Sequence, residues 1–114
     1  MTTAEFGAGP EADADVAGDA PITVEAVALG APGRLEPKRC SALAIRSLID
    51  GASPGMKLDS FSLEMGSAVF AADHLVTLDV TVDKKTHAIA FVSLEARSAD
   101  VLAFTARAVF SLAG

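Results

Sequence analysis

The feature that most constrains this chain is a run of four strand-like segments that follows a single helix-like segment. Between Lys57 and Leu112, apolar and polar residues alternate with a period of two in several segments, for example Val76 and Leu78 against Thr77 and Asp79. This alternation is typical of strands that bury one face, and strand residues such as Val and Phe are frequent in it. The four predicted strands are 58–65, 75–83, 87–97 and 101–112.

Short polar connections join these predicted strands. They lie at 71–74, 83–86 and 97–100. Connections of this length match antiparallel hairpins and leave no room for a crossover helix. The sequence therefore predicts an antiparallel meander.

One helix-like segment comes before the strands, from Glu36 to about Asp50. Pro37 suits a first helical turn, and Gly51 suits a C-terminal stop. A briefer alternation at 22–29 predicts a first strand. One amphipathic helix must cover its apolar face with a sheet, so we expect an α+β fold in which about five antiparallel strands surround one central helix. The residues predicted to share the buried helical face are Cys40, Leu43, Ala44, Ser47 and Leu48.

Length and charge distribution define the expected domain. The chain has 114 residues, which is enough for one domain, predicted at 21–114. Residues 1–20 show no apolar period and are predicted to be a disordered acidic arm. The net charge is −6, and from Arg34 onward nine basic residues balance nine of the fifteen acidic ones. The acidic excess lies in Glu5, Glu11, Asp13, Asp15, Asp19 and Glu25.

Composition argues against several classes of protein. A neutral folded part without Trp or Tyr disfavours nucleic-acid binding, which needs clustered positive charge or exposed rings. No apolar stretch approaches the roughly 20 residues that span a bilayer, so we expect a soluble, cytoplasmic protein without membrane contact. The single cysteine excludes an internal disulfide. Two histidines at dispersed positions predict neither a metal site nor a bound cofactor.

Two stretches are apolar on both strand faces, at 88–92 and 101–104. A sheet with one face in water does not favour this pattern. Because the helix can cover one face only, a second copy of the chain is the simplest cover for the rest. We therefore expect a homodimer.

Residues 58–65 and 73–110 carry a resemblance to a known family. They combine a charged hairpin, an apolar AlaPheVal strand, a polar turn followed by ValLeuAla, and a final strand containing Phe. This pattern, which covers about half of the chain, resembles small hotdog-fold acyl-CoA thioesterases of the phenylacetate-pathway type. The resemblance implies a hotdog fold, a homodimer that extends the sheet and can pair further into a tetramer, and an acyl-CoA pocket at the dimer interface.

The resemblance also implies a mechanism. Family members hold the thioester carbonyl near the helix N-terminus, where backbone N–H groups polarise it, while a carboxylate from the facing subunit's helix activates water or attacks. Residues 41–52 resemble the family's helix, which places Asp50 at the catalytic carboxylate. Glu64 is a candidate second carboxylate, and the alternative is a solvated strand residue.

Three basic residues are candidates for binding the CoA phosphates: Lys84, Lys85 and Arg39. Polyanionic phosphates favour basic side chains at the mouth of a groove. The alternative for the two lysines is a charged hairpin that prevents edge-to-edge aggregation. For Asp50 the alternative is a polar residue at a helix end. Cys40 is expected to be a buried thiol, and His74 and His87 are expected to be turn residues.

The chain departs from the family pattern at two positions. The turn before the helix is GluProLysArgCys (36–40) where the family has a HisGlyGly-like turn, and 66–72 replaces a loop with an Arg-Pro pair. The alternative to hydrolysis is therefore a non-catalytic hotdog dimer that binds an acyl ligand or serves a structural role. A hotdog hydratase is disfavoured because neither histidine lies near the helix in sequence.

Overall fold

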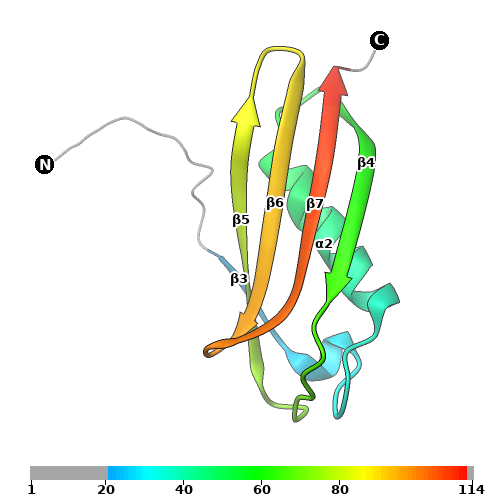
Figure 1. Cartoon of the computed structure of the whole chain (residues 1–114), viewed down its shortest axis with the longest axis vertical. Helices are drawn as coiled ribbons and strands as arrows, with labels where there is room; N and C mark the ends of the chain where they lie inside the picture. The colour runs from blue at the N-terminus through cyan, green and yellow to red at the C-terminus, as the bar shows by residue number, and fades with distance from the viewer. Residues whose placement is uncertain (1–20, 113–114) are drawn as a thin grey trace, which may run out of the picture.

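The computed structural model describes residues 21–112 and shows a five-stranded antiparallel sheet with one long helix on one of its faces (Figure 1). The strands lie in the order β3-β5-β6-β7-β4. This is the α+β architecture that the sequence predicted. The elements are β3 (Ile22–Glu25), the 3-10 helix η2 (Ala26–Leu29), α2 (Pro37–Gly51), β4 (Met56–Met65), β5 (Leu75–Lys85), β6 (Ile89–Ser98) and β7 (Val101–Leu112).

The predicted meander is right for three strands and wrong for the fourth. β5, β6 and β7 are joined by hairpins, but β4 pairs with β7 at the far edge of the sheet. The connection from β4 to β5 occupies 66–74 and crosses the end of the sheet. It is fixed by Gly66, whose N–H donates to the C=O of Ala103 (2.9 Å), and by an antiparallel bridge between Phe70 and Gly33. β3 occupies the side of β5 where a hairpin partner would lie.

The predicted first strand is too long. β3 ends at Glu25, and residues 26–29 form a 3-10 helix instead. Ala26 and Leu29 are three residues apart and both buried, which suits a 3-10 turn better than a strand. The N–H of Ala26 donates to the C=O of His74 (2.8 Å), and Gly30 ends the turn at φ 111°, a conformation that glycine adopts easily.

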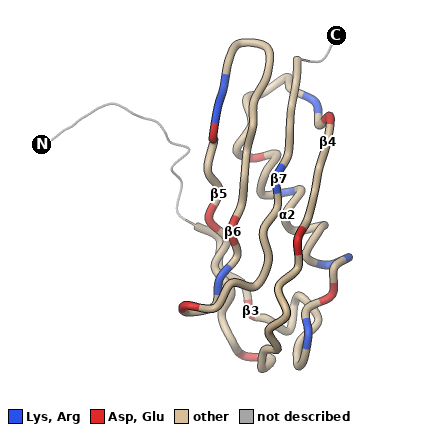
Figure 2. Tube along the Cα trace, in the orientation of Figure 1, with Lys and Arg blue, Asp and Glu red and all other residues tan. Residues whose placement is uncertain are grey.

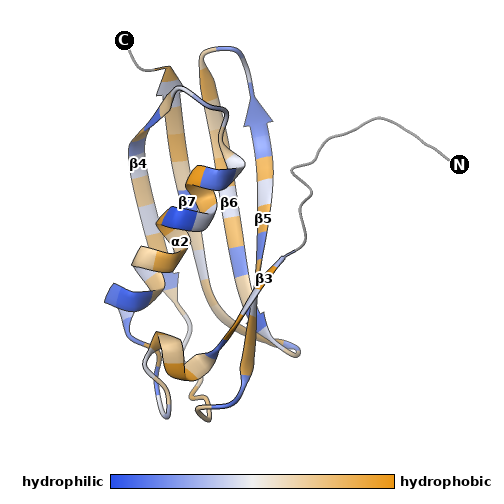
Figure 3. Cartoon of the chain, turned by 180° about the vertical axis from the view of Figure 1, so that it is seen from behind, coloured by the Kyte–Doolittle hydropathy of each residue, from blue (hydrophilic) through white to orange (hydrophobic). Residues whose placement is uncertain are grey.

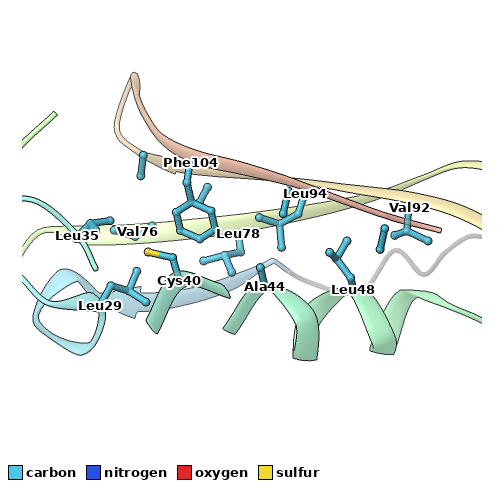
Figure 4. Close-up of a cluster of buried hydrophobic side chains, with 14 of the residues drawn as sticks. Leu29, Leu35, Cys40, Ala44, Leu48, Val76, Leu78, Val92, Leu94 and Phe104 are labelled. Carbon is cyan, nitrogen blue, oxygen red and sulfur yellow. The ribbon is translucent and has the colours of Figure 1, made fainter. Parts of the chain in front are cut away.

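The helix occupies the predicted segment. Glu36 is its N-cap, Pro37 its first residue and Gly51 its last. Figure 4 shows Cys40, Ala44 and Leu48 pointing at the sheet. These three side chains are fully buried, which confirms the predicted helical face and the buried thiol. Ser47 is also buried, and its hydroxyl donates to the C=O of Leu43 (2.9 Å), so burying it leaves no unpaired donor.

The two faces of the sheet differ. α2 runs diagonally across one face (Figure 3). Apolar side chains from every strand pack with those of α2 in the core. The opposite face, which we call the outer face, carries no second layer from residues 21–112. Within this part of the chain, no helix is long and apolar enough to cross a membrane. The predicted acidic arm at 1–20 lies outside the described residues. The largest fully buried side chains are Phe104, Phe110, Leu29, Leu48, Leu78, Leu94, Val76, Val92 and Cys40.

Gly66→Ala is expected to destabilise the protein by about 1–3 kcal/mol, because overpacking a tight contact carries a cost of this size. A Cβ at this position would lie 2.8 Å from the C=O oxygen of Leu102 and 2.9 Å from that of Ala103. Backbone atoms cannot move aside as a flexible side chain can. Chemical denaturation measures the change, with Ser67→Ala at the neighbouring exposed position as the control. Equal stabilities of the two variants would contradict the close approach.

Candidate functional site

The N-terminus of α2 presents backbone N–H groups that have no hydrogen-bond partner within residues 21–112. The first helical hydrogen bond runs from the N–H of Cys40 to the C=O of Glu36 (3.0 Å), and no side chain caps this end. Pro37 has no N–H, so Lys38 and Arg39 supply the free amides. Such amides and the helix dipole favour partial negative charge, as on a polarised carbonyl oxygen.

A carboxylate lies beside these amides. Glu36 forms an ion pair with Arg39 (Oε1 to Nε, 3.2 Å), and both side chains are exposed. Burial raises the pKa of the Cys40 thiol from 9.0 to about 11, and the negative charge of Glu36 adds to the rise. The start of the helix therefore combines the basic residues Lys38 and Arg39 and the polarising amides with the carboxylate of Glu36. The negative charge of Glu36 disfavours the binding of an anion at this end.

Asp50 lies at the other end of the helix. It is exposed and directly precedes Gly51, which packs against Val80 and Val92. The helix has 15 residues, so about 20 Å separates Asp50 from the free amides at its N-terminus. Within one protomer, Asp50 cannot reach a group bound at that N-terminus.

Glu64 lies on the outer face of the sheet. It projects from β4 opposite Thr105 of β7 and is exposed. It borders a hollow of about 790 Å³ whose floor is formed by β6 and β7. Since α2 is on the opposite face, the two candidate carboxylates, Asp50 and Glu64, do not meet within one protomer. The hollow is bordered by Glu64, Lys84, Phe91, Glu95, Arg107 and Val109.

The three candidate phosphate-binding residues are also divided. Lys84 and Lys85 end β5 next to the hairpin, and Lys84 borders the outer-face hollow. Arg39 belongs to the first turn of α2, and Figure 2 shows the basic residues of these two regions apart from one another. One protomer therefore does not gather the three side chains around one group.

The two histidines lie outside these places. The Nδ1 of His74 accepts from the N–H of Ala71 (3.1 Å), and its ring meets that of Phe70 edge to face. His87 is exposed in the turn between β5 and β6. Across residues 21–112, no three His, Cys, Asp or Glu side chains gather in the manner of a metal site.

Sequence reasoning missed the residues at the centre of the outer-face hollow. Arg107 lies between Ser62 and Ser93 on the neighbouring strands. The alternation of β6 and β7 places Ser93 and Arg107 on the face away from the helix, so a polar outer face could have been predicted. Their adjacency could not, because it depends on the pairing register.

Known structures with the same arrangement share little sequence with this chain. A mutant of the phenylacetic acid degradation protein PaaI from Thermus thermophilus matches with a TM-score of 0.67 at 15% identity, over 82% of this chain and 84% of that one. A probable thioesterase from Bartonella henselae matches with a TM-score of 0.61 at 12% identity, over 81% and 87% of the two chains.

The fold is hotdog-like. A chain of the ChsH1-ChsH2 complex from Mycobacterium tuberculosis also matches, with a TM-score of 0.60 and 21% identity, over 70% of this chain. The present chain spans 62% of that chain's length. No protein-family model and no curated protein matches the sequence. At these identities the likeness establishes the fold, and the chemistry requires a separate argument.

Cys40 is expected to be unreactive in the folded protein. With a pKa of about 11, only on the order of 10⁻³ of the thiol is ionised at pH 8, and the thiolate is the reactive form. A chromogenic disulfide reagent should detect one thiol per chain after unfolding in guanidinium and almost none before. Rapid labelling of the native protein would contradict the burial.

The same pKa predicts how stability depends on pH. A pKa raised on folding means that the native state favours the protonated thiol. The contribution of the buried thiol to the free energy of unfolding is therefore complete below pH 9.0 and is lost as the pH rises through about 11. Denaturation midpoints between pH 8 and 11, compared with those of Cys40→Ala, isolate the effect. A difference between the two proteins that does not change with pH would contradict it.

Proposed function

We propose that the protein is an acyl-CoA thioesterase-like homodimer that hydrolyses or binds an acyl-CoA thioester at its dimer interface. The observation that carries the proposal is the match in fold to PaaI and to a probable thioesterase over more than four fifths of this chain. The uncapped start of α2 supports it, because free amides there suit a thioester carbonyl.

The distances within one protomer support a dimeric site. The polarising amides and Asp50 lie at opposite ends of α2, so Asp50 can act on a thioester bound at these amides only if it comes from a second copy. β4 offers an edge for pairing with that copy, since among the strands of residues 21–112 it pairs with β7 alone. Leu58 on β4 and Leu112 beside its start are exposed apolar side chains that such pairing would cover.

The proposed chemistry assigns roles to the candidate residues. The amides of Lys38 and Arg39 polarise the carbonyl oxygen, and Asp50 of the second copy takes a proton from the attacking water. The CoA phosphates are assigned to Lys84 and Lys85 at the end of β5 and to Arg39 in the first turn of α2. One copy supplies the two lysines and the other supplies the arginine. Glu64 is assigned as a second pocket carboxylate, which one protomer cannot bring beside Asp50 because Glu64 lies on the outer face of the sheet.

One observation favours the alternative, an acyl-ligand-binding dimer without turnover. Glu36 places a negative charge at the helix end where an oxyanion would form. A charge in this position opposes the stabilisation that hydrolysis needs but leaves a neutral thioester free to bind.

Release of free CoA from a panel of short, medium, long and aromatic acyl-CoAs tests the proposal. Because Cys40 is buried, the native protein adds little to the thiol signal. Asp50→Asn is expected to lower turnover by about 10²–10⁴-fold, the usual contribution of a general base. Asp73→Asn, at a β-turn outside the helix, is the control and should retain activity.

The outcomes separate the two functions. Turnover that Asp50→Asn leaves unchanged would remove Asp50 from the mechanism. Calorimetric binding of acyl-CoA without CoA release would favour the non-catalytic dimer. Absence of both binding and release across the panel would overturn the proposal.

A further inference from the structure

Positive and negative charge are divided between the helix side and the sheet. Residues 34–51, which contain α2, carry four basic side chains and two acidic ones. Residues 52–112, which contain β4 to β7, carry five basic side chains and seven acidic ones. The helix segment is therefore net positive and the sheet net negative. An acidic segment of chain is attracted to the first and repelled by the second.

Two of the cations on α2 have no acidic partner within the described residues. Lys38 and Arg46 are exposed, and neither takes part in the three ion pairs found among residues 21–112. Arg39, in contrast, is paired with Glu36. Lys38 and Arg46 are eight residues apart, so about 12 Å of helix separates them along the axis.

A short apolar row runs along the same side of the helix. Ala42, Ile45 and Ile49 follow Lys38 at helical spacing and lie away from the buried face. Ile49 is 50% exposed, although it is a large apolar side chain. The exposed side of α2 therefore offers both cations and apolar surface, and such a mixed surface suits a segment that carries carboxylates and apolar side chains.

The acidic arm, residues 1–20, has the complementary charge. It contains five acidic side chains and no Lys or Arg. Glu11, Asp13 and Asp15 occur at every second position, so in an extended chain their carboxylates lie on one side, about 7 Å apart. Val16 follows them as a large apolar residue.

The arm joins the described part of the chain within reach of α2. Ile22 at the start of β3 pairs with Leu78, and two residues further along β5 Val80 lies against Gly51 at the end of α2. Twenty extended residues span up to roughly 66 Å, whereas the 15 residues of α2 are about 22 Å long. Because few residues separate the acidic positions from this point, bringing them onto the helix costs little loop entropy.

We propose that the acidic arm binds along the exposed side of α2 in its own chain. Because the arm joins beside the C-terminal half of α2, Asp15 lies near Arg46 and Glu11 lies near Lys38. A single exposed ion pair contributes little, so several pairs and the short connection together hold the arm in place. This proposal goes beyond the proposed function and does not depend on thioester chemistry.

Carbodiimide coupling of carboxylates to lysine amines in the full chain tests the binding, because this reagent joins only groups in direct contact. Lys38 is the only one of the four lysines on α2, and the other three lie on strands. Carboxylates of the arm are expected to link mainly to Lys38, and raised salt should reduce these links. Peptide mass spectrometry of a mixture of unlabelled and isotope-labelled protein separates links within one chain from links between two chains.

Arg46→Glu is expected to lower the yield of the Lys38 links by about 2- to 10-fold, because an attraction along the path becomes a repulsion. Arg107→Glu is the matched control. It makes the same change of charge at an exposed site on the outer face and should leave the yield unchanged. Circular dichroism checks that each variant is folded, and the distribution of links in the unaltered chain decides the question if a variant unfolds.

Three results would overturn the proposal. The arm could link evenly to all four lysines or mainly to those on the strands, its links to Lys38 could form only between chains, or the folded Arg46 variant could keep the yield of the control. None of these results would bear on CoA release, so a failure here is distinct from a failure of the proposed function.

Discussion

The packing of α2 against the sheet is the contact on which the rest of the structure depends. Cys40, Ala44 and Leu48 lie fully buried against side chains from β5, β6 and β7. Small residues permit the close approach: Gly51 lies where an added Cβ would be 3.0 Å from Val80. Burying a side chain such as Leu48 contributes about 1.5–3 kcal/mol. Without this helix, the sheet would expose its apolar face.

A single helix also sets the limits of the protomer. It covers one face, and no second layer from residues 21–112 covers the other. β4 closes the sheet against β7, and no strand of the described part of the chain pairs with its other edge. Surfaces without an internal partner are thus a consequence of the topology.

Much of the fold could be predicted because alternation and helical spacing report which side of each element is buried. The predicted faces of β5 and α2 match the structure, as at Val76 and Leu78. The alternation of apolar and polar residues does not report which strands are neighbours in the sheet. The position of β4 beside β7 could therefore not be predicted. The segment 26–29 is misassigned from sequence because all four of its residues are apolar. Such a run fits the end of a strand until the burial of Ala26 and Leu29 and the hydrogen bonds to 72–74 are known.

The candidate site shows the same division between local pattern and long-range placement. Sequence could nominate Asp50 and Glu64 as carboxylates, but it could not show that the sheet lies between them. It also could not show that Arg107 has Ser62 and Ser93 as neighbours, since that follows from strand register. Separation along a rigid helix then has a chemical consequence. Asp50 and the amides at the N-terminus of α2 are about 20 Å apart on one helix. They can act on the same bond only if the helices of two chains lie side by side in opposite directions, and a two-fold pair of chains provides this arrangement. For the proposed hydrolysis by Asp50, assembly would therefore be part of the chemistry.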